Sequence, residues 1–387
     1  MNKELMDRVM EATRLTQSGR LQEATALLQG VLAPGSDTAR PAAFKAASDV
    51  IDGECTEVGV EDAQQGSDEE GARAGAPDAL PAFLRRFMNR KAPANGSAAR
   101  GVDLPGKVVS GSYANAAGVR AYRLYIPSRY TAGQALPLIV MLHGCKQTPD
   151  DFAAGTRMNE LGEEHGCFVL YPEQSSAANA GGCWNWFRKE DQVRGKGEPS
   201  ILAGMVGQVM TRYSIVPGRV YAAGLSAGGA MAAVLAVTYP DLFAAVGIHS
   251  GLACGSAHDL PSALAAMKGM PVAPTASSSG GRVMPTIVFH GDRDRTVHPR
   301  NGADVISQSP HHRLNGTEAT TERGQAPGGH AYTKTVHRNA SGRVVLEHWE
   351  VHGGGHAWFG GSRDGSYTDA RAPDASREML RFFLQSA

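Results

Sequence analysis

The strongest constraint on the fold of this chain is a set of short, almost continuously apolar runs that begins after about residue 107. Examples are Leu138–Leu142 (LIVML) and Thr286–Phe289 (TIVF), which lack the alternation of apolar and polar residues found in half-exposed strands. Runs of this kind are typical of strands covered on both faces. The sequence therefore predicts an α/β fold with a mostly parallel central sheet and helices on both faces.

The apolar runs alternate with segments of helical character. The expected strands are residues 108–113, 119–126, 138–143, 168–171, 219–223, 244–249 and 286–290, followed by a late pair within 332–351. The expected helices are residues 150–164, 200–213, 227–239, 301–308 and 373–385. The first two strands are expected to form an antiparallel hairpin at the start of the sheet.

The first hundred residues have a different composition. Residues 1–32 are predicted to form a helical hairpin, because apolar residues recur there at helical spacing. Residues 33–78 are rich in Ala, Gly, Pro, Asp and Glu, which favours a low-complexity linker. Residues 79–107 contain a basic amphipathic helix and a connector, and this helix either docks on the catalytic domain or anchors the chain to a lipid or polymer surface. The domain at 108–387 then carries the chemistry.

Charge and cysteine content exclude several classes of function. Lys plus Arg and Asp plus Glu number 38 each, so the net charge of zero argues against binding nucleic acid or anionic membranes. The five cysteines show no CxxC spacing, which argues against a zinc ribbon or a disulfide scaffold. The charged N-terminus lacks the apolar block of a secretory signal, so a cytoplasmic protein is expected, with an extracellular one as the alternative.

The segment Gly224–Gly228 (GLSAG) matches the pattern GxSxG between an expected strand and an expected helix. A sharp turn at this place exposes the serine hydroxyl, and the helix N-terminus adds partial positive charge to the site. In a chain with 47 glycines the bare pattern arises easily by chance, so its position supports the prediction. Ser226 is therefore predicted to be a nucleophile rather than a buried serine in a glycine-rich turn.

A nucleophilic serine needs a base, and the base needs an acid that orients it. Asp294 follows the strand expected at 286–290, at the sheet edge where ligands of parallel sheets bind. We favour Asp294 as this acid and take Asp292 as the second candidate. The alternative is that Asp294 is a solvated acidic residue in a turn, without a catalytic role.

The candidate base is His356, which lies in a glycine-rich loop directly after the last strand. His352 is expected to end that strand instead. The order Ser226, Asp294, His356 is the chain order of the α/β-hydrolase triad.

Two backbone amides are expected to stabilise the oxyanion that forms during ester cleavage. One is Ala227, directly after the nucleophile, and the other is Cys145, in the loop that begins at His143 after an expected strand. The Cys145 thiol has no histidine and asparagine spaced as in thiol proteases, which argues against its being a nucleophile. Cys183 could form a disulfide with Cys145, and the sequence does not decide whether it does.

These segments together carry a resemblance to a known family. The stretches LHGCKQ, GGCWNWF, RVYAAGLSAGGAMAAVLA, FHGDRDRTVHP and GGGHAW resemble the polyhydroxybutyrate (PHB) depolymerase family of serine esterases, which is related to feruloyl and acetylxylan esterases. The resemblance spans roughly Val108 to Gln385. It implies an α/β-hydrolase fold, triad roles for Ser226, Asp294 and His356, an oxyanion role for Cys145, and a substrate-facing loop at Trp184 and Trp186.

We expect one of these tryptophans to pack on the sheet and the other to line the acyl cleft, with His143 among the substrate-binding residues. The expected activity is hydrolysis of 3-hydroxyalkanoate polymer or oligomers without a metal or cofactor, by a signal-less, intracellular type of member. The expected partner is the ester itself or a PHB granule surface, and the N-terminal hairpin is alternatively a contact within a homodimer. Short-chain, feruloyl or acetylxylan esters are alternative substrates, and a granule-binding protein with a vestigial hydrolase is the alternative from another class.

Overall fold

The structure is a computed structural model that describes residues 103–270, 284–309 and 318–386. The helical hairpin expected at 1–32, the linker at 33–78 and the amphipathic helix after residue 79 lie outside the described residues. Among the described residues, no helix combines the length and the apolar character needed to cross a bilayer.

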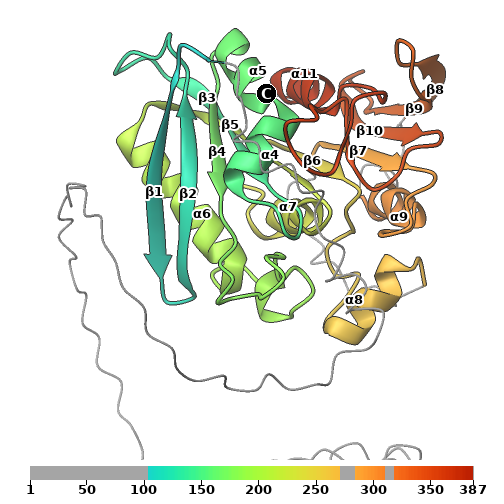
Figure 1. The fold of residues 1–387 in the computed structure, drawn as a ribbon, viewed down its shortest axis with the longest axis horizontal. Coiled ribbons are helices and arrows are strands. Elements are labelled where there is room, and N and C mark those ends of the chain that lie inside the picture. The colour runs from blue at the N-terminus through green and yellow to red at the C-terminus, as the bar shows by residue number, and fades with distance from the viewer. Residues whose placement is uncertain (1–102, 271–283, 310–317, 387) are drawn as a thin grey trace, which may run out of the picture. The chain divides into compact units, whose positions relative to one another are not determined.

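The core of the described chain is a ten-stranded sheet with the order β1-β2-β4-β3-β5-β6-β7-β10-β9-β8 (Figure 1). The strands are β1 (Lys107–Asn115), β2 (Gly118–Ile126), β3 (Leu136–Leu142), β4 (Phe168–Pro172), β5 (Ile215–Leu225), β6 (Ala245–His249), β7 (Thr286–Gly291), β8 (Glu318–Gln325), β9 (Ala331–Arg338) and β10 (Val344–Val351). The run from β4 to β10 is parallel, whereas β1-β2 and β8-β9 add antiparallel hairpins at its two sides. The predictions of a mostly parallel sheet and of an opening hairpin are confirmed.

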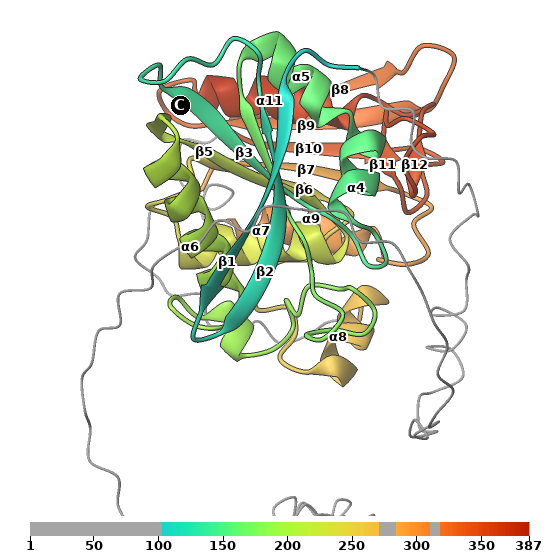
Figure 2. The same ribbon diagram turned by 60° about the vertical axis from the view of Figure 1, so that its left-hand side comes forward.

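Helices cover both faces of the sheet (Figure 2). They are α4 (Pro149–Thr156), α5 (Met158–His165), α6 (Gly197–Arg212), α7 (Ala227–Thr238), α8 (Leu260–Met267), α9 (Arg300–Gln308) and α11 (Ala375–Ser386). Along β3, Leu138 and Val140 pack in the cluster that includes α6 and α7, while Ile139 and Met141 pack in the cluster that includes α5 and α11. Burial of both sets of side chains explains why this strand is apolar at nearly every position.

Some boundaries differ from the prediction. The single helix expected at 150–164 is two helices, because Arg157 takes a left-handed conformation (φ 55°) between α4 and α5. The strand β8 was not predicted, since its side chains are almost all exposed and show no apolar pattern. The short helix α8 was also missed, although Asp259 and Ser262 form a capping box at its start.

Buried histidines make the stability of this fold sensitive to acid. Burial lowers the pKa of His249, His290 and His348, to about 4 for His348, whereas the unfolded side chains titrate near 6.5. The unfolded chain therefore binds more protons below about pH 6.5, and the free energy of unfolding should fall as the pH drops from 6.5 toward 4. Asp191 offsets part of this loss of stability. Burial raises its pKa to about 6, so the folded state binds a proton at a higher pH than the unfolded state does.

Replacing His348 by leucine should reduce this acid sensitivity without loss of stability at pH 7. The buried His348 Nε2 atom has no hydrogen-bond partner among the described residues, so an apolar side chain of similar size removes an unsatisfied polar group. Urea unfolding at pH 7 and pH 5 measures both effects, with His258→Gln as the control because that side chain is 45% exposed. An H348L protein that loses as much stability between the two pH values as the wild type would contradict the prediction.

Candidate active site

Ser226 lies at a strained turn between β5 and α7. Its backbone dihedrals are φ 58° and ψ −117°, which a residue with a side chain rarely adopts. The flanking glycines are a steric necessity: a Cβ at Gly228 would lie 2.0 Å from the carbonyl oxygen of Leu142, and one at Gly224 would lie 2.4 Å from Gly228 C. The GxSxG spacing is thus what allows the turn to pack against the end of β3.

Asp294 and His356 form a close pair although 62 residues separate them in sequence. His356 Nδ1 lies 2.7 Å from Asp294 Oδ2, and the other carboxylate oxygen accepts the backbone N–H groups of Thr296 (2.8 Å) and Val297 (2.9 Å). Burial raises the pKa of Asp294, but the hydrogen bond and charge of His356 and the other contacts outweigh it and leave the pKa below its usual value. A buried, ionised carboxylate is therefore available to orient the His356 ring.

The competing acid, Asp292, has a different environment. Its Oδ1 accepts the backbone N–H of Gly353 at 2.7 Å, and its Oδ2 lies 3.2 Å from His352 Nδ1. These contacts tie down the loop that carries His356 and do not include the His356 ring. The geometry therefore favours Asp294 over Asp292 as the acid.

One cavity of about 60 Å³ brings the catalytic candidates together. Its lining comprises Gly144, Cys145, Lys146, Gln147, Leu225, Ser226, Thr296, His356 and Tyr367. Ala227 is not part of the lining, but its N–H is the first of α7, where amides have no partner within the helix. Ser226, His356 and Cys145 thus share one cavity, with the Ala227 amide directly after Ser226 in the chain.

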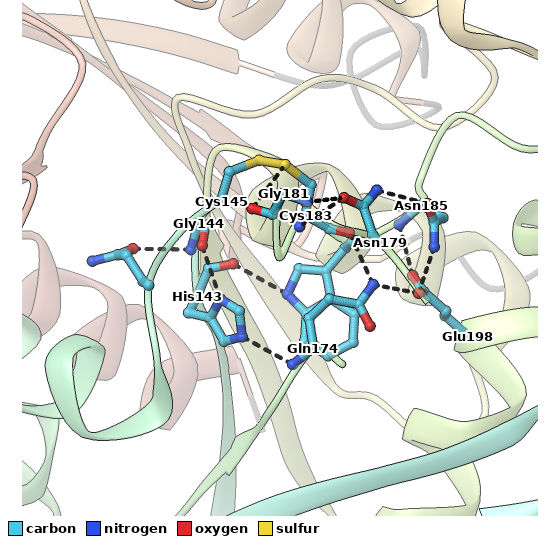
Figure 3. Close-up of a disulfide and its surroundings, with 11 residues drawn as sticks. His143, Gly144, Cys145, Gln174, Asn179, Gly181, Cys183, Asn185 and Glu198 are labelled. Atoms are coloured by element: carbon cyan, nitrogen blue, oxygen red, sulfur yellow. Dashed lines mark hydrogen bonds between the residues drawn. A yellow bond between two sulfur atoms is a disulfide. The ribbon is translucent and has the colours of Figure 1, made fainter. Parts of the chain in front are cut away.

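Cys145 is joined to Cys183 by a disulfide, with 4.2 Å between their Cα atoms (Figure 3). A backbone hydrogen bond from Lys146 N to Gly181 O (3.1 Å) runs beside the bridge. Two loops that follow different strands, β3 and β4, are therefore fastened together at the cavity. The structure therefore contains the disulfide that the sequence alone did not decide.

The loop Gly182–Phe187 does not line the cavity, which corrects the prediction of a substrate-facing tryptophan. Trp184 is fully buried and donates from Nε1 to the carbonyl oxygen of His143 at 3.1 Å, while Trp186 is 6% exposed and packs in the α6–α7 cluster. His143 is also buried and absent from the lining. The physical reason is that the loop folds inward under the disulfide, so its large side chains contribute to the core.

Tyr367 is a lining residue outside every stretch that the sequence analysis singled out, and Thr296 is one to which it gave no role. Tyr367 lies in a left-handed conformation (φ 53°) just before β12 (Thr368–Asp369), and its carbonyl oxygen accepts Trp358 N from β11 (Trp358–Phe359) at 2.6 Å. Among the described non-glycine residues with positive φ, three line this cavity: Lys146, Ser226 and Tyr367. Backbone strain of this kind concentrates at functional sites, but no sequence pattern marks Tyr367.

Removing the disulfide should destabilise the domain and loosen the cavity wall. For a bridge that spans 38 residues, the chain-entropy model gives a loss of about 4 kcal/mol in the free energy of unfolding. We expect this loss in a Cys145→Ala, Cys183→Ala double variant, measured by urea unfolding, whereas Cys254→Ala serves as the control because Cys254 is free. Equal stabilities of the double variant and the wild type would show that the bridge does not stabilise the fold.

The sequence is similar to known ester hydrolases. The family model described as "Esterase PHB depolymerase" matches residues 120–330, a stretch that contains Ser226 and Asp294. Poly(3-hydroxyalkanoate) depolymerase C of Paucimonas lemoignei is 34% identical over 242 residues, which cover 60% of this chain and 57% of that protein's length. Feruloyl esterase B of Neurospora crassa is 29% identical over 243 residues, covering 59% of this chain and 80% of the relative.

A solved structure supports the fold as well. The acetyl xylan esterase from Aspergillus awamori aligns with a TM-score of 0.54 at 20% identity, and the alignment covers 72% of this chain and all of that one. The likeness establishes an α/β-hydrolase fold, as predicted. Because the family model spans more than half of the sequence, the chain belongs to the esterase PHB depolymerase family.

Proposed function

We propose that this chain is a serine esterase that hydrolyses esters of 3-hydroxyalkanoates, as polymer or oligomers, through an acyl-enzyme on Ser226. The observation that carries the proposal is the shared cavity: Ser226 and His356 both line it, and Asp294 holds the His356 ring at 2.7 Å. This set of groups is what nucleophilic ester cleavage requires.

The proposed cycle has two halves. His356 accepts the Ser226 proton as the hydroxyl attacks the ester carbonyl, and the Cys145 and Ala227 amides donate hydrogen bonds to the resulting oxyanion. His356 then gives the proton to the leaving alcohol. In the second half His356 activates a water molecule that releases the acid and restores Ser226.

The preference for a 3-hydroxyalkanoate rests on similarity to a relative. The chain is 34% identical over 242 residues to a poly(3-hydroxyalkanoate) depolymerase, which supports a 3-hydroxybutyryl group over an acetyl or feruloyl group. Tyr367 and Thr296, which line the cavity, are the side chains we expect to contact the acyl group.

The test is a panel of esters at equal concentration. We expect the highest kcat/KM on 3-hydroxybutyrate oligomers, lower values on p-nitrophenyl acetate and acetylated xylan, and the lowest on methyl ferulate. A preference for acetylated xylan or methyl ferulate would replace the substrate with one of the alternatives. A folded wild-type chain that hydrolyses none of these esters would overturn the proposal. It would favour the alternative of a granule-binding protein with a vestigial hydrolase.

The compartment is a separate part of this proposal. Disulfides persist mainly in oxidising compartments, so the Cys145–Cys183 bridge supports the extracellular alternative over the cytoplasmic expectation. Fractionation of the source cells with an antibody to this chain tests it. Recovery of the protein in the cytoplasm with both thiols reduced would reject this assignment.

A further inference from the structure

The tautomer of His143 is fixed by its neighbours. The backbone N–H of Gln174 can only donate, and it points at His143 Nε2 at 3.1 Å, so this nitrogen accepts and carries no proton. Burial lowers the pKa of His143, which keeps the ring neutral. The proton therefore lies on His143 Nδ1, which donates to the carbonyl oxygen of Gly144 at 2.8 Å.

This hydrogen bond determines which way the next peptide group faces. The Gly144–Cys145 peptide is trans, and in a trans peptide the C=O and N–H bonds point in opposite directions. The Gly144 carbonyl is held on the side of His143, and it also accepts Gln147 N at 3.2 Å. The Cys145 N–H must therefore point away from His143, and both Gly144 and Cys145 line the cavity that contains Ser226.

We infer that His143 is a positioning residue that holds the Gly144–Cys145 peptide with its N–H toward the oxyanion, and that Gln174 and Glu198 hold His143 in the tautomer this requires. The inference rests on the proposed esterase function and deepens it. His143 thus acts through a backbone amide without contacting the ester.

The support for Gln174 comes from a buried polar network (Figure 3). Gln174 Nε2 donates to Glu198 Oε1 and to the carbonyl oxygen of Cys183 (2.8 Å), and Gln174 Oε1 accepts from Arg120 Nε at 2.7 Å. Glu198, 3% exposed, also accepts from the Asn185 backbone N–H (2.7 Å) and pairs with Arg120 Nη2 (3.0 Å). Every functional group of the Gln174 side chain is engaged, so its backbone N–H is held on His143 Nε2.

Two substitutions of His143 separate its two hydrogen bonds. In His143→Asn the amide nitrogen can take the place of Nδ1 and still donate to Gly144 O, whereas the acceptor for Gln174 N is lost. In His143→Gln the amide oxygen can take the place of Nε2 and still accept from Gln174 N, whereas the donor to Gly144 O is lost. A merely structural role predicts similar effects from both variants.

The measurement is the affinity for an alkyl trifluoromethyl ketone, whose adduct with a serine places an oxyanion in the hole, read by ¹⁹F NMR alongside kcat and KM. We expect H143Q to bind the ketone about 10- to 100-fold more weakly and to lose kcat in parallel with little change in KM, since loss of a whole oxyanion donor costs about 10²- to 10³-fold. We expect H143N to stay within a few-fold of the wild type in both.

Equal losses in H143N and H143Q, or full ketone affinity in H143Q, would overturn the inference. If H143Q does not fold, Gln174→Ala decides. It loosens the backbone N–H that keeps the His143 proton on Nδ1, a constraint that the asparagine of H143N does not need, and it should weaken ketone binding while leaving KM unchanged. Unaltered ketone affinity would count against the inference. Formation of the ketone adduct measures the strength of the oxyanion hole and does not require ester turnover. A wild type that binds the ketone but cleaves no ester would therefore reject the proposed function and leave the comparison of the two variants decisive.

Discussion

Replacing Ser226 by alanine should lower kcat for ester hydrolysis by at least about 10⁴-fold while leaving a folded protein. The substitution removes the hydroxyl oxygen that we propose forms the acyl-enzyme, and what remains is binding and the oxyanion donors. Alanine adds no bulk at the turn, so the packing of Gly224 and Gly228 against β3 is preserved. Thermal unfolding measured beside the activity on p-nitrophenyl acetate separates lost chemistry from lost structure.

A matched control for this variant is Ser250→Ala. Ser250 is also buried and also has a positive φ (48°), but it does not line the cavity. We expect S250A to keep activity within a few-fold of the wild type. Retention of more than a tenth of the activity in S226A would exclude Ser226 as the nucleophile.

The second large effect is expected at Asp294. In Asp294→Asn the amide can present an N–H where the carboxylate accepted His356 Nδ1, which favours the wrong tautomer of the base. The loss of kcat should be about 10³- to 10⁴-fold. Because the pKa of Asp294 lies below its usual value, the wild-type carboxylate is ionised throughout the neutral range and can orient the His356 ring there.

Asp292→Asn is the comparison that decides the acid. Asp292 contacts Gly353 N and His352, so its amide variant should loosen the loop and cost no more than about tenfold in kcat. Steady-state kinetics of both variants on one soluble ester give the ranking. If D292N proved the more damaging of the two, the assignment of Asp294 would be wrong.

The catalytic candidates could be placed from sequence because a parallel sheet brings the carboxyl ends of its strands to one edge. Ser226 follows β5, Asp294 follows β7 and His356 follows β10, so an apolar run before each residue was enough to predict that they meet. The same reasoning placed Cys145 after β3.

The support of the site could not be predicted in the same way. Two tryptophans in a glycine-rich loop are compatible with a cleft wall or with a core, and only the inward course of the chain decides for Trp184. Glu198 and Arg120 are charged residues that composition assigns to the surface, yet they pair in the interior because Gln174 and Asn185 complete their hydrogen bonds. Such compensation depends on tertiary contacts that no local pattern reveals.

The strand β8 has a consequence for how copies of this protein behave at high concentration. It is the outermost described strand on its side of the sheet, and an outer strand exposes backbone groups that can pair with another chain. Its sequence, EATTERGQ, is polar and charged, and Glu322 pairs across the hairpin with Lys334. Edge-to-edge aggregation through this strand is therefore disfavoured by the same exposed, polar side chains that hid the strand from the sequence pattern.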